Sequence, residues 1–218
     1  MQVDFFFDPM CPWAFQTSKW IREIPDVEVR WRFFSLEEIN RVDGKKHPWE
    51  REWSYGWSLM RVGAWARRRD PALLDAWYAT IGAALHERGE QPHVREEAVR
   101  FAAEAGLPEG AVDEAIADPT TTDEVRADHD EVVSTHGAFG VPTLVFPNGH
   151  ALFGPVITPA PTGDAALRLW DLVQGWVEFP HLYELRKPKT PADHAHIAES
   201  FTPYLTARSW RTIQNPVA

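Results

Sequence analysis

The sequence predicts an α/β fold in which a β-α-β unit and a later β-hairpin are separated by a long helical segment. The β-α-β unit is indicated by an aromatic strand, QVDFFF at residues 2–7, and by an alternating strand, VEVRWRFFSL at residues 27–36. Strand-like sequence returns only at GVPTLVF, residues 140–146. The residues between have helical periodicity, which makes the segment an insertion into the α/β fold.

The first unit places the single cysteine of the chain at a strand-to-helix junction. Asp8 and the proline after it end the aromatic strand. Cys11 and Pro12 then begin a helix that extends to about Ile24, since proline is favoured in the first turn of a helix. Cys11 is therefore expected at the N-terminus of the first helix.

The middle segment, residues 37–137, is expected to be an inserted all-helical subdomain. Helices are predicted over residues 49–69, 71–88, 94–105, 109–117 and 122–135, with proline and glycine pairs between them. Trp49, Trp53 and Trp57 are spaced by four and would share one helix face. Core packing is the favoured explanation of that face, and an aromatic wall for a flat substrate is the alternative. Arg61 is expected in a surface salt bridge rather than beside an anionic group near the thiol.

The last third of the chain is expected to hold a hairpin, one helix and a tail. A turn at residues 147–149 follows the strand at 140–146 and leads into HALFG, and a helix follows at 165–177. Residues 184–218 are rich in proline, histidine and polar residues, so we expect an extended C-terminal tail that packs partly over the domain.

This order of elements is that of a thioredoxin-like fold with an insertion. Residues 1–36 and 138–183 would form the thioredoxin-like domain, and residues 37–137 the helical insert.

Composition excludes several classes of partner. The formal net charge of −10 argues against nucleic acid and anionic membranes as partners. No apolar run approaches the ~20 residues that a membrane-spanning helix needs, and the N-terminus has no basic leader, so a cytoplasmic location is expected. The short pair His194 and His196 lacks the further ligands of a metal site, so no metal is expected. The sequence leaves the oligomeric state open.

Cys11 is the predicted catalytic residue. A thiol reacts as its thiolate, and the free N–H groups and positive dipole at a helix N-terminus stabilise negative charge. The sequence therefore predicts a lowered pKa for Cys11. An inert, buried cysteine is the alternative.

Ala14 stands where a Cys-x-x-Cys motif would have its second cysteine. A dithiol enzyme resolves its mixed disulfide with that second thiol, whereas this chain would need an external thiol. The expected chemistry is therefore that of a monothiol. Ala14 as an engineered replacement, made to trap an intermediate, is the other explanation left open.

The loop Gly140-Val141-Pro142-Thr143 is the second predicted element of the site. In thioredoxin-like folds this loop holds a cis-proline beside the active cysteine. Val141 and Pro142 are assigned that place, where the backbone of Val141 would pair with a bound thiol compound as a short strand would.

These residues resemble the DsbA-like thioredoxin family, and within it the actinobacterial branch of the mycothiol-dependent nitroreductases. The motifs that carry the resemblance are FFFDPMCPW, FSLEEIN ending in Asn40, GVPT, FGPV at residues 153–156, and PHLYELRK at residues 180–187. The resemblance implies a DsbA-type thioredoxin-like fold with a helical subdomain. It also implies mycothiol as the thiol co-substrate, with glutathione as the alternative left open, and small electrophilic or nitroaromatic compounds as substrates.

The resemblance further implies a thiol-binding site around Cys11. Its expected members are Pro12, Trp13, Ala14, Asn40, Val141, Pro142 and Thr143. Trp13 is expected to be exposed beside the thiol, where it could stack on a substrate. Ala14 departs from the family pattern, which has a second cysteine there.

Three functions are consistent with these observations. The first is a thiol-dependent oxidoreductase or thiol transferase that uses Cys11. The second is a binding module of the same fold that lost catalysis with the second cysteine. The third is a glutathione-dependent isomerase or transferase, as in the sister branch of 2-hydroxychromene-2-carboxylate isomerases and kappa-class transferases. Proteins of that branch usually carry serine at the first motif position, so Cys11 argues against the isomerase.

Overall fold

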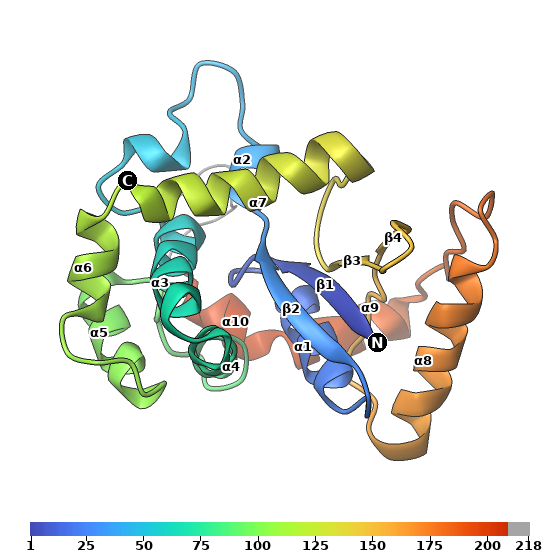
Figure 1. Cartoon of the computed structure of the whole chain (residues 1–218). Helices are drawn as coiled ribbons and strands as arrows, with labels where there is room; N and C mark the ends of the chain where they lie inside the picture. The colour runs from blue at the N-terminus through green and yellow to red at the C-terminus, as the bar shows by residue number, and fades with distance from the viewer. Residues whose placement is uncertain (209–218) are drawn as a thin grey trace.

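The computed structural model describes residues 1–208 of the 218-residue chain, and its centre is a four-stranded mixed sheet (Figure 1). The strand order is β2-β1-β3-β4. The strands are β1 (Gln2–Phe7), β2 (Glu28–Phe33), β3 (Thr143–Val145) and β4 (Ala151–Phe153). β1 pairs in parallel with β2 and antiparallel with β3, so the hairpin from late in the chain lies directly beside the first strand.

The β-α-β unit forms as predicted. Five of the six residues of β1 are buried, because this central strand is covered on both faces. Its aromatic side chains make the core: the Phe7 ring stacks on Tyr78 with centroids 3.8 Å apart, and Phe5 packs edge-on against Trp31 at 5.0 Å. Helix α1 (Pro12–Arg22) follows β1 and starts at the predicted proline.

The segment between β2 and β3 is helical, as the sequence predicted. Its helices are α2 (Leu36–Ile39), the 3-10 turn η1 (Pro48–Glu50), α3 (Tyr55–Arg69), α4 (Pro71–His86), α5 (Arg95–Glu104), α6 (Ala111–Ala117) and α7 (Thr120–His136). Figure 1 shows α3 to α6 gathered on one side of the sheet and the later helix α8 (Gly163–Val177) on the other. The exact division of the chain into a domain and an insert stays a prediction.

The helix predicted over 49–69 begins instead at Tyr55. Glu37 stabilises the non-helical segment before Tyr55. Ser54 Oγ donates to the Glu37 carboxylate at 2.7 Å, and the Arg51 guanidinium forms an ion pair with the same carboxylate. The three tryptophans therefore do not share a helix face. Trp53 donates its Nε1–H to the carbonyl of His93 (2.8 Å), while the Trp49 ring packs 5.1 Å from that of Trp57.

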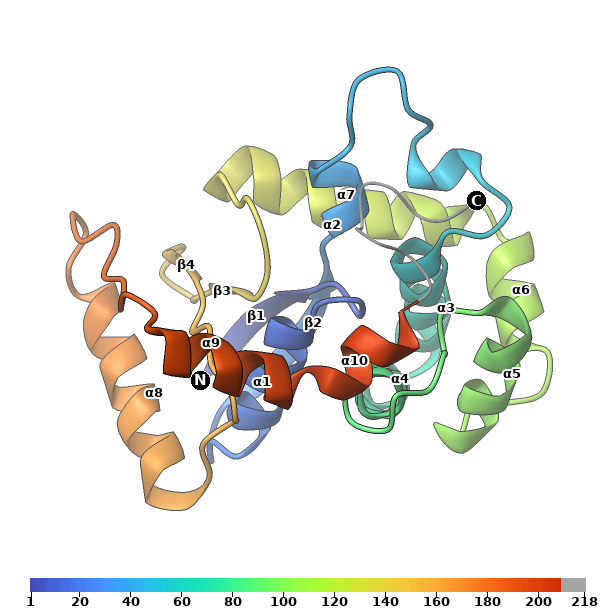
Figure 2. The same ribbon diagram turned by 180° about the vertical axis from the view of Figure 1, so that it is seen from behind.

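The predicted extended tail is wrong over residues 191–207, which form helices α9 (Pro191–Ser200) and α10 (Thr202–Ala207). Thr190 and Asp193 make a reciprocal capping box at the start of α9, and Pro191 occupies its first turn. Figure 2 shows both helices crossing in front of α1 toward α4. Residues 209–218 of the predicted tail lie outside the described residues. Among residues 1–208, no helix is both long and apolar enough to cross a membrane.

Candidate active site

Cys11 is the N-cap residue of α1, directly after the central strand. Its own N–H donates to the carbonyl of Asp8 at 3.0 Å, which forms the turn out of β1. The N–H of Ala14 donates to Cys11 Sγ at 3.5 Å, and the thiol lies 3.7 Å from the carbonyl oxygen of Val141. The structure therefore brings together the two motifs that the sequence analysis singled out, although 130 residues separate them.

The loop before β3 aims the Val141 carbonyl at the thiol. The Val141–Pro142 peptide bond is cis. The Thr143 hydroxyl donates to the carbonyl of Gly140 at 2.8 Å, and the carbonyl of Pro142 accepts from the N–H of Gly154 at 2.8 Å. The Thr143 hydroxyl thus stabilises the loop through a hydrogen bond within it.

The predicted lowering of the pKa of Cys11 is wrong for this arrangement. Cys11 is only 5% exposed, and burial of its thiol raises the pKa to about 12. The N–H groups at the start of α1 do lower the pKa, as the helix end should, but by less than burial raises it. The negative charge of Asp8 raises the pKa further. The helix terminus alone does not make Cys11 a thiolate here.

Asp8 is a buried carboxylate that the sequence analysis treated only as the end of a strand. It is 2% exposed, and burial raises its pKa to about 6. Its two oxygens accept the N–H groups of Met10 and Leu36, each at 2.8 Å, so it joins the turn before Cys11 to the start of α2. Gly56 permits this burial, because a Cβ there would lie 2.6 Å from Asp8 Oδ1.

An aromatic shell from three helices surrounds the motif. Trp13 is half-buried rather than exposed, and Phe201 packs edge-on against it with ring centroids 4.7 Å apart. His86 donates from Nε2 to the carbonyl of Pro9 at 2.9 Å. Its ring stacks on Phe15, and burial lowers its pKa to about 4, so it is neutral.

The sequence analysis did not find His86, Phe201 or Tyr204 near the motif. His86 also packs against Tyr204, with ring centroids 5.3 Å apart. These residues lie far from Cys11 along the chain, and no local pattern signals their proximity.

The remaining predicted site residues differ in their placement. Ala14 is fully buried beside the thiol, and Pro12 is half-buried in the first turn of α1. Asn40 is exposed and ends α2, where its Nδ2 donates to the carbonyl of Leu36 at 2.8 Å. Among the described contacts, none joins the Asn40 side chain to Cys11.

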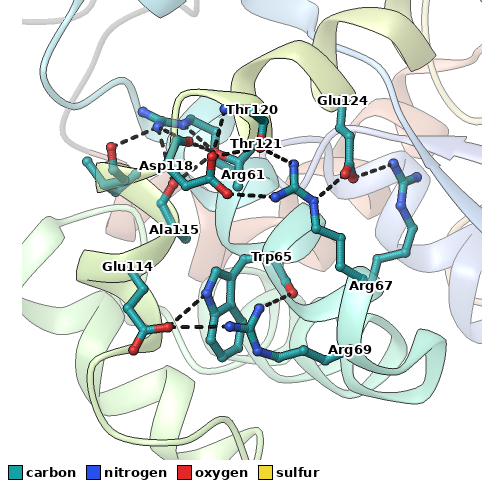
Figure 3. A network of polar contacts seen from close by, with 12 residues as sticks. Arg61, Trp65, Arg67, Arg69, Glu114, Ala115, Asp118, Thr120, Thr121 and Glu124 are labelled. Carbon is teal, nitrogen blue, oxygen red and sulfur yellow. Dashed lines mark hydrogen bonds and ion pairs between the residues drawn. The ribbon is translucent and has the colours of Figure 1, made fainter.

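Arg61 has a structural role that neither sequence expectation described. Figure 3 shows its guanidinium directed at the end of α6. It donates to the carbonyls of Ala115, Ile116 and Asp118 at 2.8 to 3.2 Å, and to Thr121 Oγ1 at 3.0 Å. It therefore satisfies the last carbonyls of a helix, which have no partner within it. Among residues 1–208 it forms neither a surface salt bridge nor an anion site near the thiol.

A hollow of about 690 Å³ lies between the end of α1, strand β2 and the start of α4. Its walls contain none of the predicted site residues. In the part of the chain that the structure describes, no group of three or more His, Cys, Asp or Glu side chains is placed to hold a metal ion.

Comparison with known proteins shows which family this chain belongs to. The profile of the Rv2466c-like family, described as "Mycothiol-dependent nitroreductase Rv2466c", matches residues 10–187. The chain belongs to this family of thiol oxidoreductases. The resemblance inferred from the sequence motifs is confirmed. The match contains the cysteine motif and the loop at 140–143, and it ends before α9 begins.

The chain is also 55% identical over 214 residues to the uncharacterized protein Rv2286c of Mycobacterium tuberculosis, covering 97% of this chain and 92% of that one. Among solved structures it is similar to the probable DsbA oxidoreductase SCO1869 of Streptomyces coelicolor (24% identity, TM-score 0.55, 87% of this chain and 93% of that chain). It is also similar to the cytosolic disulfide reductase DsbM of Pseudomonas aeruginosa with GSH (16%, TM-score 0.56, 80% and 100%). A 2-hydroxychromene-2-carboxylate isomerase is similar too (14%, TM-score 0.58, 82% and 95%). These structures confirm the DsbA-type thioredoxin-like fold.

Proposed function

We propose that this protein is a cytoplasmic monothiol oxidoreductase or thiol transferase that uses Cys11 with mycothiol. The observation that carries the proposal is the position of Cys11 at the N-cap of α1, 3.7 Å from the Val141 carbonyl, with Ala14 in place of a second thiol. Family membership supports mycothiol as the partner.

The reaction would proceed in two exchanges at Cys11. The Cys11 thiolate attacks one sulfur of a disulfide, a new S–S bond forms, and the other sulfur leaves as a thiolate that takes a proton from water. A mycothiol thiolate then attacks the substrate sulfur of the mixed disulfide, forms an S–S bond with it and releases the Cys11 thiolate. Because Ala14 offers no sulfur, this second step needs the external thiol. A second mycothiol completes the reduction away from Cys11, because it displaces the substrate thiolate and forms oxidised mycothiol. Two thiols supply two electrons, enough to reduce one disulfide, or one nitro group to a nitroso group with loss of water.

Each predicted site residue would have its own role in binding the thiol compound or the substrate. The Val141 backbone, turned toward Cys11 by Pro142 and Thr143, would pair with the backbone-like amide of the thiol compound. Pro12 and Ala14 would shape the first turn of α1 beside the thiol. Trp13 would contact the substrate, and Asn40 would line the outer rim.

Intact mass measured across a pH series tests the proposal. The protein is incubated with oxidised mycothiol and, separately, with oxidised glutathione. We expect a single adduct of one mycothiol, formed faster than the glutathione adduct and absent from Cys11→Ser. Failure to form any adduct across the pH series would remove the enzyme proposal, and a faster glutathione adduct would replace mycothiol as the partner.

A binding module is the second candidate function, and one observation favours it. Cys11 is buried, and its pKa is raised rather than lowered. A binding module would bind the reduced thiol compound equally well in the wild type and in Cys11→Ser, and would form no adduct. A glutathione-dependent isomerase or transferase would instead convert its substrate with no net oxidation of glutathione.

A further inference from the structure

The last helix of the described chain lies against the cysteine motif. Phe201, at the junction of α9 and α10, is 6% exposed and packs edge-on against Trp13. It covers part of the Trp13 side chain, which the proposed function assigns to substrate contact. The sequence analysis expected this tryptophan to be exposed, and Phe201 is one physical reason that it is not.

Tyr204 brings α10 close to the residues just before Cys11. It is buried against His86, whose Nε2–H is bonded to the carbonyl of Pro9, two residues before Cys11. Burial raises the pKa of Tyr204, and the charges of Cys11 and Asp8 raise it further, which agrees with a position close to the thiol. Phe201 and Tyr204 therefore bracket the segment that contains Cys11.

The segment is attached to the rest of the molecule mainly through three buried residues, Phe201, Tyr204 and Ala207. Residues 178–190, which lead to it, are exposed, and α9 has no buried residue. Beyond Phe201 and Tyr204, the polar contacts of the segment with the body include His196 Nε2 with the carbonyl of Thr158 (3.2 Å) and Gln91 Nε2 with the carbonyl of Ala207 (2.8 Å). Segments with few buried contacts open at low free-energy cost. The segment also lies outside residues 10–187, which match the family.

We propose that α10 is a removable cover over Cys11, and that a disulfide reaches the thiol only after Phe201 and Tyr204 have left Trp13 and His86. The arrangement described here is the closed state, in which Cys11 is shielded from water. Opening would hydrate the thiol and free the face of Trp13 in one movement. The proposal concerns access to Cys11 and holds for any disulfide, whichever thiol the proposed function uses.

The rate of reaction with 5,5′-dithiobis(2-nitrobenzoate) tests this proposal. The Cys11 thiolate attacks one sulfur of the reagent, and the coloured thionitrobenzoate leaves. When a thiol reacts only from a minor open state, its rate follows the population of that state. We expect Phe201→Ala and Tyr204→Ala to react roughly tenfold faster than the wild type or more.

Leu205→Ala is the matched control, because Leu205 is on the same helix but 43% exposed. Its rate should stay within about twofold of the wild type, since it does not hold the cover closed. Equal rates in all four proteins would overturn the proposal, as would an increase in Leu205→Ala as large as in the other two variants.

Hydrogen exchange of the wild type gives an answer even if the variants fold poorly. Amide exchange is compared before and after Cys11 carries the thionitrobenzoate group. We expect faster exchange in residues 202–207 of the adduct and unchanged exchange in α4. Unchanged protection of residues 202–207 would show that the thiol reacts beneath a closed α10, and the cover would be wrong. If mycothiol forms no adduct while these results hold, the proposed function fails and the cover stands.

Discussion

Cys11 and Arg61 both face helix ends, and they differ in how burial is offset. Cys11 lies at the N-terminus of α1, and Arg61 faces the C-terminus of α6. Burial acts on both in the same sense: it raises the pKa of the thiol and lowers that of the guanidinium, so it disfavours each charged form. Arg61 has four oxygen acceptors around it (Figure 3), whereas the sulfur of Cys11 accepts from Ala14 at 3.5 Å and has a carboxylate nearby.

The two helix ends therefore differ in the number of partners that replace the lost water, four for the half-buried guanidinium and one for the buried sulfur. Arg61 is held by charge-assisted hydrogen bonds, which are stronger than neutral ones. Sulfur accepts hydrogen bonds weakly. In the closed site Cys11 is therefore a protonated thiol. Its ionisation requires either more water around the sulfur or another hydrogen-bond donor to it.

Arg61→Met should cause the largest loss of stability, because it removes the partner of several helix-end carbonyls while keeping the apolar stem. We expect the free energy of unfolding to fall by about 3 kcal/mol, since each buried acceptor left without a partner costs about 1 kcal/mol or more. Thr121 also donates to the carbonyls of Ala115 and Asp118, which limits the loss. Denaturant unfolding measures the change.

Arg126→Met is the control for that experiment. Arg126 is exposed, pairs with exposed Asp130 at 3.3 Å and lies over the Trp49 ring at 4.8 Å, so its loss should cost about 1 kcal/mol. Equal losses in the two variants would mean that the Arg61 contacts contribute no more than a surface ion pair.

Ala14→Cys should have the next largest effect, because it gives Cys11 a covalent partner. Residues three apart in a helix have neighbouring side chains, within the distance that a disulfide spans. We expect the mixed disulfide on Cys11 to be displaced by Cys at position 14, which shortens the life of the adduct roughly a hundredfold or more. Intact mass with time measures the loss of the adduct and the two hydrogens lost on disulfide formation.

Ala14→Ser is the matched control, since it adds a similar group at this buried position without a second thiol. Its adduct should persist as in the wild type until an external thiol is added. An adduct in Ala14→Cys that lives as long as in Ala14→Ser would show that position 14 cannot reach the mixed disulfide, and the comparison with dithiol relatives would fail.

The fold was largely predictable because its signals are local. The aromatic strand, the Cys11-Pro12 helix start and the later hairpin are each specified by a few adjacent residues. The break before Tyr55 was not predictable in this way, because Glu37, in helix α2, stabilises it from a distant part of the sequence. The helices of the tail had a local signal that was missed, the capping pair Thr190 and Asp193 around Pro191.

The sequence predicted which residues meet at the candidate site, but not how deeply Cys11 is buried among residues from distant parts of the chain. Two sequence motifs sufficed to pair Cys11 with Val141. The sign of the pKa shift depends on burial, and neighbours distant in the sequence, such as Val141 and Tyr204, lie close to the buried thiol. No pattern around Cys11 contains that information, so the sequence indicates the stabilising helix end but not the burial that opposes it.

Asp8→Asn gives the smallest expected effect. It distinguishes the two influences that raise the pKa of Cys11, namely burial and the negative charge of Asp8. The folded pKa of Asp8 is about 6, above its ordinary value, so the folded state binds this proton more tightly than the unfolded state. Asp8 therefore lowers the free energy of unfolding as pH rises from about 4 to about 6, by about 2–3 kcal/mol in total. His86 and His93, whose burial lowers their pKa to about 4, act in the opposite direction between about 4 and 6.5.

Because these opposing groups remain in Asp8→Asn, the difference between variant and wild type isolates the carboxyl. Asparagine offers one acceptor where Asp8 offers two, to Met10 and Leu36, so the variant should be less stable than the wild type at pH 4. Relative to the wild type it should gain stability up to pH 6.5, and its Cys11 should react faster at pH 8 because a negative charge has been removed. A stability difference that does not change with pH would mean that Asp8 is ionised throughout. Its charge would then already be compensated in the fold, and burial alone would oppose the thiolate.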